Sequence, residues 1–282
     1  MKKILIPTDF SDAAWNALFT AIKLFADTPC HFFILNTYEP EFANVLGDKS
    51  KQRLGIIYDS LSKQSHQELG KVLDYFEKNQ KNKNHALEKI SRADDLVSVV
   101  KEIVQEKDID IIIMGTTGAT GAKQVFMGSN TVKVINAIRN RPIIAVPENH
   151  DVQRLAHIIF PTDFTKHFET FELKALVELA SLWKSNISIV HVAQEFLMSN
   201  TQEANKVLLT KRLKGLEHSF HKVEMKVDVA EAIGEYAKES AADMLALIHY
   251  RHTFMEKLTR EPVVKKVAFH TQIPLLVLPE LS

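Results

Sequence analysis

Short apolar runs alternate along the chain with longer stretches in which apolar residues recur every three or four positions. Runs such as "DIIIM" and "IIAV" are continuous, which is typical of strands buried on both faces of a parallel sheet. Ser11 suits a helix N-cap, and after it Trp15, Leu18, Ile22 and Phe25 share one face. Similar spacing recurs at residues 60–80, 94–107 and 129–139. The alternation predicts an α/β fold of right-handed βαβ units, with helices on both faces of a parallel sheet.

The chain repeats itself once. The sequence "PTDF" stands at residues 7–10 and again at 161–164, each time after a short apolar run. Near the end of each copy, "RPIIAVPE" matches "IPLLVLPE". The offset between the copies falls from 154 residues at the front to 132 at the back, so the second copy is about 22 residues shorter, mostly after its second strand. We therefore predict two tandem domains, residues 1–150 and 151–282, each with its own doubly wound sheet.

Composition and charge narrow the class of protein. No apolar run reaches the roughly 18 residues that a membrane span needs, and the opening "MKKILIPTDF" is too short for a signal-peptide core. We therefore expect a cytoplasmic protein that does not enter membranes. Lys and Arg together number 35, as do Asp and Glu, and neither copy carries a basic excess. Nucleic acids and anionic membrane surfaces are accordingly not expected as partners.

Glycine is concentrated in "GTTGATGAKQVFMGSNTV", residues 115–132, which holds four of the chain's nine glycines. This stretch follows a buried strand and runs into a helix that Ser129 can open. The N–H groups at such a helix start point outward with the positive end of the helix dipole behind them, which suits a phosphate group. Ser129, Asn130 and Thr131 would add polar donors, whereas Lys123 is expected to be a solvated loop residue. A flexible structural loop is the alternative interpretation.

Two familiar glycine motifs do not match this stretch. A P-loop needs G-x-x-x-x-G-K-[ST], but Lys123 follows Ala122 and precedes Gln124. The Rossmann fingerprint follows the first strand of its unit, whereas these glycines follow the fourth and have another spacing.

The spacing Gly115-x2-Gly118-x9-Gly128-Ser129 instead resembles that of the ATP-binding class of universal stress proteins. The "PTDF" after the first strand resembles the start of that family, and the order of elements agrees over almost the whole chain. The resemblance implies a five-stranded parallel sheet of order 3-2-1-4-5 in each domain. It also implies ATP, with or without Mg²⁺, at the switch point between strands one and four of the N-terminal domain, where ligands of such sheets bind.

The resemblance also implies roles for individual residues. The nucleoside side of the site would be lined by Pro7, Thr8, Thr37, Met114 and Gly115, of which Thr37 is the weakest candidate. Asp9 would face the ribose or a magnesium ion, with a helix-capping carboxylate as the alternative. For Met114 a place in the core is an equal alternative. The phosphates would be held by Gly118, Gly128, Ser129, Asn130 and Thr131. No catalytic residue and no protein-bound metal site is assigned.

The second copy lacks this glycine pattern. Its matching segment, residues 245–267, contains no glycine. Ile248 stands where Gly115 stood, and Glu261 falls near the position of Gly128. Because bulky side chains would fill the space and a carboxylate would repel phosphate, we predict that the second domain does not bind ATP.

Cysteine and histidine leave two alternatives open. The single cysteine, Cys30, excludes an intramolecular disulfide and is interpreted as a small buried side chain rather than a redox or catalytic thiol. Eight of the twelve histidines follow residue 150, among them His191, His249 and His252. Separate packed or solvated histidines are expected there, with a zinc site as the alternative.

The last strands of the two copies, "PIIAVP" and "PLLVLP", are apolar edges within one chain. The resemblance implies dimers in which single domains pair their fifth strands as antiparallel edges, and an exposed apolar edge invites pairing. We therefore predict that the two strands pair with each other and form an internal pseudo-dimer. Whether two chains associate further as a homodimer is left open.

The leading functional hypothesis is a nucleotide-responsive stress regulator that binds ATP in its N-terminal domain and acts through an unidentified protein partner. One alternative is an enzyme that uses the same site, such as a slow ATPase or a nucleotidyl transferase. The other is a non-nucleotide interaction module in which the glycine loop is structural.

Overall fold

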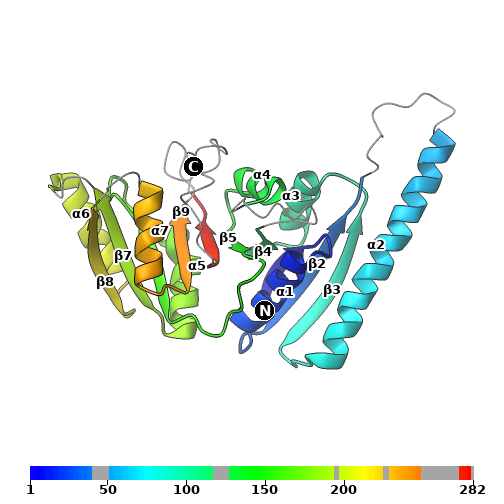
Figure 1. The fold of residues 1–282 in the computed structure, drawn as a ribbon, viewed down its shortest axis with the longest axis horizontal. Coiled ribbons are helices and arrows are strands. Elements are labelled where there is room, and N and C mark those ends of the chain that lie inside the picture. Colours follow the sequence, from blue (N-terminus) through cyan, green and yellow to red (C-terminus); the bar gives the residue numbers. More distant parts are fainter. Residues whose placement is uncertain (40–50, 117–126, 194–196, 225–228, 249–272, 281–282) are drawn as a thin grey trace.

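The computed structural model describes residues 1–39, 51–116, 127–193, 197–224, 229–248 and 273–280 (Figure 1). Its strands are β1 (Lys2–Pro7), β2 (Cys30–Thr37), β3 (His85–Arg92), β4 (Ile111–Gly115), β5 (Ile143–Val146), β6 (His157–Pro161), β7 (Asn186–Ala193), β8 (His218–Glu224), β9 (Met244–Ile248) and β10 (Leu275–Leu278). Its helices are α1 (Asp12–Leu24), α2 (Lys51–Asn79), α3 (Leu96–Glu106), α4 (Ser129–Ala137), α5 (Thr170–Trp183), α6 (Asn200–Arg212) and α7 (Val229–Glu239). The predicted α/β alternation is confirmed in both copies.

The described strands form a single sheet in the order β3-β2-β1-β4-β5-β10-β9-β6-β7-β8. Every neighbouring pair within each copy is parallel, and each copy has the order 3-2-1-4-5 when its own strands are counted from its start. In such an order the connections leave β1 in opposite directions, so the carboxyl ends of β1 and β4 border the place where ligands of doubly wound sheets bind.

The two copies join through β5 and β10, which pair antiparallel as predicted. Ile144 lies opposite Leu276, and Leu275 lies opposite Ala145. Ile144 and Leu276 are equivalent positions of the repeat, so a pseudo-two-fold axis passes through this pair. Both side chains are fully buried. The internal pseudo-dimer is therefore one continuous sheet, in which the apolar edges of the two copies protect each other.

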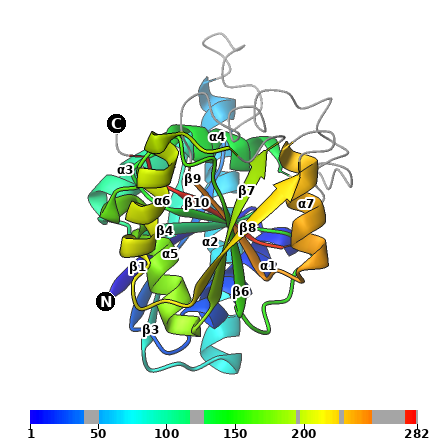
Figure 2. The same ribbon diagram turned by 90° about the vertical axis from the view of Figure 1, so that its left-hand side faces the viewer.

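Helices cover both faces of the twisted sheet (Figure 2). Buried residues of α1, α2, α5 and α6 belong to one apolar cluster, and those of α3, α4 and α7 belong to another on the opposite face. Each cluster takes in strand residues from both copies, for example Ile4 and Ile158 in the first and Leu5 and Ile159 in the second. The core is therefore continuous across the pseudo-two-fold axis.

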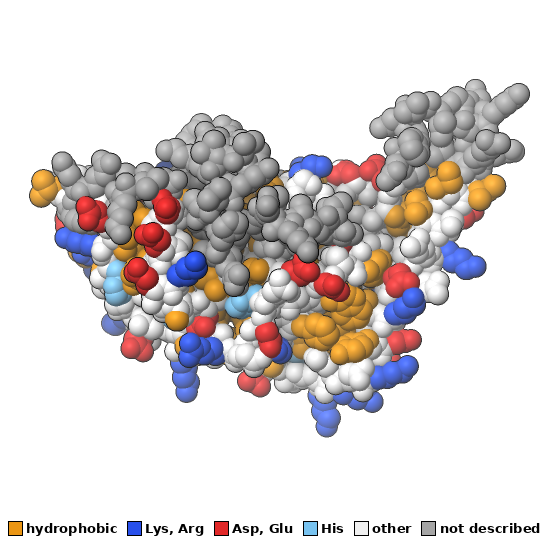
Figure 3. Space-filling model, viewed as in Figure 1, with side chains coloured by type: hydrophobic (Ala, Val, Ile, Leu, Met, Phe, Trp, Pro, Cys, Tyr) orange, Lys and Arg blue, Asp and Glu red, His pale blue; other side chains and the backbone are white. Residues whose placement is uncertain are grey.

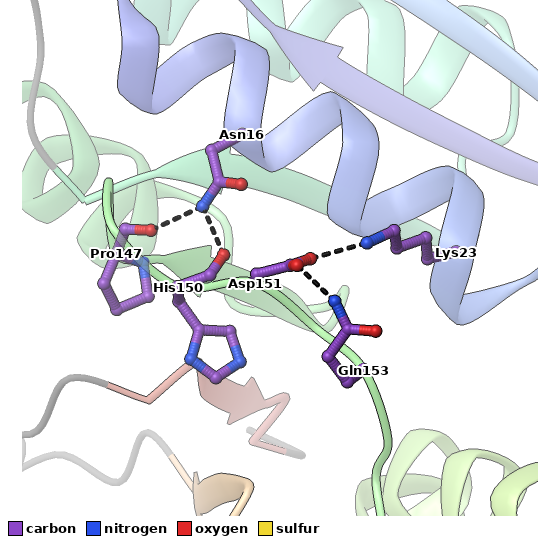
Figure 4. A network of polar contacts seen from close by, with 6 residues as sticks. All are labelled: Asn16, Lys23, Pro147, His150, Asp151 and Gln153. Carbon is purple, nitrogen blue, oxygen red and sulfur yellow. Dashed lines mark hydrogen bonds and ion pairs between the residues drawn. The ribbon is translucent and has the colours of Figure 1, made fainter.

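Helix α1 holds the segment that connects the copies (Figure 4). The Asn16 side-chain amide donates to the carbonyl oxygens of Pro147 and His150, at 2.8 and 2.7 Å. About two turns further along α1, the Lys23 ammonium lies 2.5 Å from Asp151 Oδ1, and the Gln153 amide donates to the same carboxylate. Hydrogen bonds to its backbone carbonyls and an ion pair with Asp151 therefore hold the connecting segment against α1 of the first copy.

The shorter length of the second copy has a definite place in the structure. Thirteen residues separate β2 from α2, whereas six separate β7 from α6. Helix α2 has 29 residues and α6 has 13. The shortening therefore falls on one loop and one helix, after the second strand as the sequence predicts.

Charged and apolar side chains are mixed on the surface. On the face shown in Figure 3, basic and acidic side chains are interspersed. Trp15, Phe19, Tyr75 and Phe76 form an aromatic cluster between α1 and α2 with ring centroids 5.4 to 6.2 Å apart. Phe76 is buried and Tyr75 is 40% exposed. Among the described residues, no helix is long and apolar enough to span a membrane.

Cys30, at the start of β2, is fully buried. Desolvation by burial raises the pKa of its thiol to about 11, against an opposing effect of the nearby Lys2 ammonium. A thiol of this kind is an unreactive core group, as predicted.

Candidate functional site

A tight turn at the carboxyl end of β1 carries the first candidate residues. The Thr8 N–H donates to the Leu35 carbonyl of β2 at 2.8 Å, which continues the sheet by one residue. The Thr8 hydroxyl then accepts from the N–H of Phe10 at 3.0 Å. Phe10 has φ 64°, a left-handed conformation that few residues other than glycine adopt. The turn is therefore held by its own hydrogen bonds and by the sheet.

Asp9 is exposed, and its carboxylate orients the start of α1. Its Oδ1 accepts from the Ser11 N–H at 3.1 Å and from the Ser11 hydroxyl at 2.5 Å. Ser11 in turn is the N-cap of α1 and accepts from the Ala14 N–H. Asp9 therefore orients the N-cap residue Ser11 and is not itself the N-cap of α1. This differs from the alternative interpretation of Asp9 as a helix-capping carboxylate. A carboxylate has about four acceptor positions, so this contact leaves it chemically able to bind a ribose hydroxyl or a cation.

Gly115 ends β4 directly against α1. A Cβ atom at this position would lie 2.9 Å from the carbonyl carbon and oxygen of Ala13 and 3.0 Å from its Cβ, closer than real contacts of this kind. In the structure the missing side chain of Gly115 therefore makes room for the first turn of α1. The sequence suggested room for a ligand instead and gave no sign of this contact.

The residues on either side of the glycine stretch meet at the end of β4. The Thr116 N–H donates to the Val146 carbonyl at 2.8 Å, and the Gly128 N–H donates to the Thr116 carbonyl. The Thr131 hydroxyl is buried and donates to the Gly115 carbonyl at 2.8 Å. That hydroxyl therefore ties α4 to β4 in this structure, although a phosphate-binding role was expected for Thr131.

Helix α4 begins beside this junction, and no side chain in the described part of the chain caps it. Gly128 is its N-cap, at φ −66° and ψ 158°, and makes no side-chain hydrogen bond. Ser129 and Asn130, the first two residues of α4, are exposed. The first N–H groups of a helix lack intrahelical partners and carry its positive dipole. Because Gly115 packs on Ala13, this helix start and the Asp9 turn lie at adjacent strand ends.

The remaining candidates have mixed positions. Pro7 is buried at the end of β1, and Thr37 is half-buried at the end of β2, next to Arg92 of β3. Met114 is 5% exposed and packs in the cluster on the α3 and α4 face, which supports its place in the core. Gly118 and Lys123 lie outside the described residues, as do His249 and His252. No group of three His, Cys, Asp or Glu residues in the described part of the chain is placed to hold a metal ion.

The second copy repeats the turn at the end of β6. The Thr162 hydroxyl accepts from the Phe164 N–H at 3.0 Å, and Phe164 has φ 57°. Asp163 Oδ1 accepts from the Thr165 N–H at 2.9 Å and from its hydroxyl at 2.8 Å. The "PTDF" repeat is thus a repeat of conformation as well as sequence.

Two polar residues that the sequence analysis did not connect with these turns support them. The Asn36 amide donates to the Thr8 carbonyl at 2.8 Å, and His191 Nδ1 lies 3.1 Å from the Thr162 carbonyl. Each is a buried polar side chain near the carboxyl end of its copy's second strand. A lone polar residue inside an apolar run, as in "FFILNT" and "SIVHV", was the available signal.

Comparison with known proteins agrees with this architecture. The family model described as "Universal stress protein family" matches residues 1–146. The chain belongs to the universal stress protein family. In Methanocaldococcus jannaschii, universal stress protein MJ0531 is 30% identical over 135 residues, 48% of this chain and 75% of that protein. Universal stress protein MJ0577 from the same organism is 29% identical over 154 residues, 51% of this chain and 94% of that protein.

Solved structures of the family extend the likeness of fold to both copies. A universal stress protein from Archaeoglobus fulgidus superposes with a TM-score of 0.67 at 16% identity, covering 99% of this chain and 96% of that chain. A putative universal stress protein from Pseudomonas aeruginosa gives a TM-score of 0.60 at 14% identity, covering 99% and 93%. The family model matches by sequence only the first copy, whereas these folds match the whole chain. The second copy has therefore kept the universal stress protein fold while its sequence diverged.

Proposed function

We propose that this universal stress protein binds ATP, with or without Mg²⁺, in its first copy and acts as a nucleotide-responsive stress regulator. The proposed site is the switch point between the carboxyl ends of β1 and β4. The observation that carries the proposal is the start of α4, which is led by a glycine, has no side-chain cap among the described residues, and follows β4, the strand that pairs with β1.

The phosphate side of the proposed site is built from the start of α4. The N–H of Gly128 donates to the Thr116 carbonyl, whereas no side chain of the described residues caps the N–H groups that follow it, which an external acceptor could therefore use. Ser129 and Asn130 add exposed polar groups at the same place. Gly118, from the same motif, would complete this side.

The nucleoside side of the proposed site is built from β1 and β2. Thr8 and Asp9 stand at the end of β1, and Thr37 at the end of the neighbouring strand. Asp9 would receive a ribose hydroxyl or a magnesium ion, since its position is already fixed by Ser11. Pro7 and Gly115 border the same proposed site, whereas Met114 would support it from the core.

A nucleotide extraction tests this proposal. The protein is purified without added nucleotide, denatured, and the released small molecules are identified by chromatography and mass spectrometry. We expect near-stoichiometric ATP from the natural protein and none from Gly128→Glu. The N-cap backbone of Gly128 is open to any residue, so the substitution adds a carboxylate to the phosphate side without backbone strain.

Gly70→Glu is the matched control. It makes the same change in charge on α2, where an added Cβ atom meets nothing within 4 Å. We expect this variant to release as much ATP as the natural protein. A natural protein that releases no nucleotide and gains no melting temperature from added ATP and Mg²⁺ would overturn the proposal and favour a non-nucleotide interaction module.

A further inference from the structure

Strand β8 forms one end of the ten-stranded sheet. In the described part of the chain it pairs with β7 alone, in parallel register. Figure 2 looks onto this edge, with α6 on one side of β8 and α7 on the other. None of the residues of β8 is buried. The edge is therefore of the kind that can accept a further strand.

The backbone groups of alternate residues of β8 point away from β7. The Ile187 N–H of β7 donates to the Glu217 carbonyl at 2.9 Å, so residue 217 faces β7 and, by alternation, so do residues 219, 221 and 223. The N–H and C=O groups of residues 218, 220, 222 and 224 point outward. An added antiparallel strand must pair its own outward-pointing residues with these four. When that strand is β8 of another chain, the two-fold axis therefore passes through a residue and not between two residues.

The sequence of β8 is complementary to itself in this arrangement. Because β8 has seven residues, a pairing that uses the whole strand places His221 on the axis. His218 then lies opposite Glu224 of the other chain, and Phe220 lies opposite Lys222. An imidazole opposite a carboxylate and an ammonium opposite an aromatic ring are favourable cross-strand pairs, whereas like charges directly opposite each other are unfavourable.

The opposite edge of the sheet, β3, lacks this complementarity. The Cys30 N–H of β2 donates to the Asn84 carbonyl at 2.9 Å, so the outward-pointing residues of β3 are 85, 87, 89 and 91. A two-fold pairing that uses most of β3 places one of its two middle residues, Glu88 or Lys89, on the axis. Each would meet the same charge in the other chain, which disfavours the pairing. Association through β8 consequently closes after two chains.

We propose that β8 is a dimerisation edge that pairs antiparallel with β8 of a second chain of the same sequence, on an axis through His221. The sheets of the two chains then continue into each other, as the two halves of one chain already do through β5 and β10. This inference is independent of whether the first copy binds ATP.

Disulfide trapping tests the register of the proposed pair. The two His221 residues would form a non-hydrogen-bonded pair with Cα atoms about 4.5 Å apart, which is within the range of a disulfide. We expect His221→Cys to give a covalent dimer under mild oxidation. Ser219→Cys is the matched control on the same face of the strand, and both variants lose the hydrogen bond between Ser219 and His221. Its two cysteines would lie about 13 Å apart along the strands, so we expect no cross-link.

Sedimentation equilibrium tests the charge pairs. We expect the natural protein to sediment as two chains and His218→Glu as one, because the new carboxylate lies opposite Glu224 twice in each dimer. Adding Glu224→Lys to His218→Glu restores an opposite pair and is expected to restore the dimer. Lys89→Glu, a charge change on the β3 edge, is expected to leave the dimer intact.

Several results would overturn the proposal. They are a natural protein that sediments as a single chain or as an assembly larger than two chains, and a dimer that His218→Glu leaves intact. Equal cross-linking of Ser219→Cys and His221→Cys, or none in His221→Cys, would also overturn it.

Discussion

The turn at residues 8–11 and the turn at residues 162–165 have the same conformation but different surroundings. In each, a threonine hydroxyl accepts from a left-handed phenylalanine, and an aspartate accepts from the next hydroxyl residue. The first turn lies beside a glycine that packs on α1. The carbonyls of the second turn accept from the Gln202 and Asn205 side-chain amides of α6, and Ile248 stands at the end of β9 in place of a glycine.

This difference teaches that "PTDF" by itself specifies a turn and not a ligand. Its hydrogen bonds are complete in a copy that has lost the glycine pattern. Nucleotide binding, as proposed for the first copy, must depend on what surrounds the turn. The spacing of helix and strand contributes to those surroundings, since α1 begins five residues after β1 ends, whereas α5 begins nine residues after β6 ends. We attribute the room for Ile248 to this later helix start.

The largest expected loss of stability comes from substitutions in the β5–β10 pair, to which both copies contribute one strand. Ile144→Ala and Leu276→Ala each remove a fully buried side chain on the pseudo-two-fold axis. We expect each to lower the free energy of unfolding by about 2–5 kcal/mol, measured by urea denaturation. The exposed Val207→Ala is expected to change it by under about 0.5 kcal/mol. A large loss for one axis residue and none for the other would contradict an equivalent role of the two.

Gly115→Ala should destabilise the first copy through a close contact that has no counterpart in the second copy. Its new Cβ would collide with the Ala13 backbone, so we expect a loss of about 1–3 kcal/mol in urea denaturation. Gly70→Ala, in an open position of α2, is expected to stabilise by about 0.5–1 kcal/mol. If both substitutions stabilise, Gly115 is not required by the packing of α1.

Substitutions of Asp9 and Asp163 distinguish the stabilising role that both aspartates have in their turns from the ligand-binding role proposed for Asp9 alone. We expect Asp9→Ala and Asp163→Ala to cost about 1 kcal/mol of stability each, because both turns lose the same two hydrogen bonds. Asn keeps the accepting oxygen. Asp9→Asn should therefore keep the stability and weaken Mg²⁺-dependent ATP binding, whereas Asp163→Asn should change neither. Equal effects of the two Asn variants on ATP binding would remove the distinction between the copies.

The smallest effect concerns the connection between the copies. The Lys23 ammonium and the Gln153 amide hold the pKa of Asp151 below its usual value of 3.8. A lowered pKa in the folded state stabilises the protein above pH about 4, and that contribution is lost as the pH falls through the folded-state pKa. We expect Lys23→Met to raise the Asp151 pKa in an NMR titration, with no effect on stability at pH 7 beyond that of an exposed ion pair. An unchanged pKa would show that Lys23 does not hold the connection.

Periodicity and repetition were enough to predict the α/β class and the duplication, and the resemblance to a family added the antiparallel β5–β10 pair. The spacing of apolar residues indicates which faces of the elements are buried. The apolar strands "PIIAVP" and "PLLVLP" would leave exposed edges unless they paired. The close contact of Gly115 with Ala13 could not be predicted, because it depends on where α1 crosses β4. The hydrogen bonds of the Thr131 hydroxyl and of the Gln202 and Asn205 amides depend in the same way on helix placement. The Thr131 hydroxyl, for which a phosphate-binding role was expected, donates to the backbone of β4 in this structure.

The most direct test of the account is the number of ATP molecules bound per chain. Equilibrium dialysis of the natural protein against labelled ATP and Mg²⁺, with the protein concentration fixed by amino-acid analysis, gives this number. The account predicts one ATP per 282-residue chain, lost in Gly128→Glu and kept in Asp163→Asn. Two ATP per chain would show that the second copy is open, and none would show that the glycine segment of the first copy serves the fold alone.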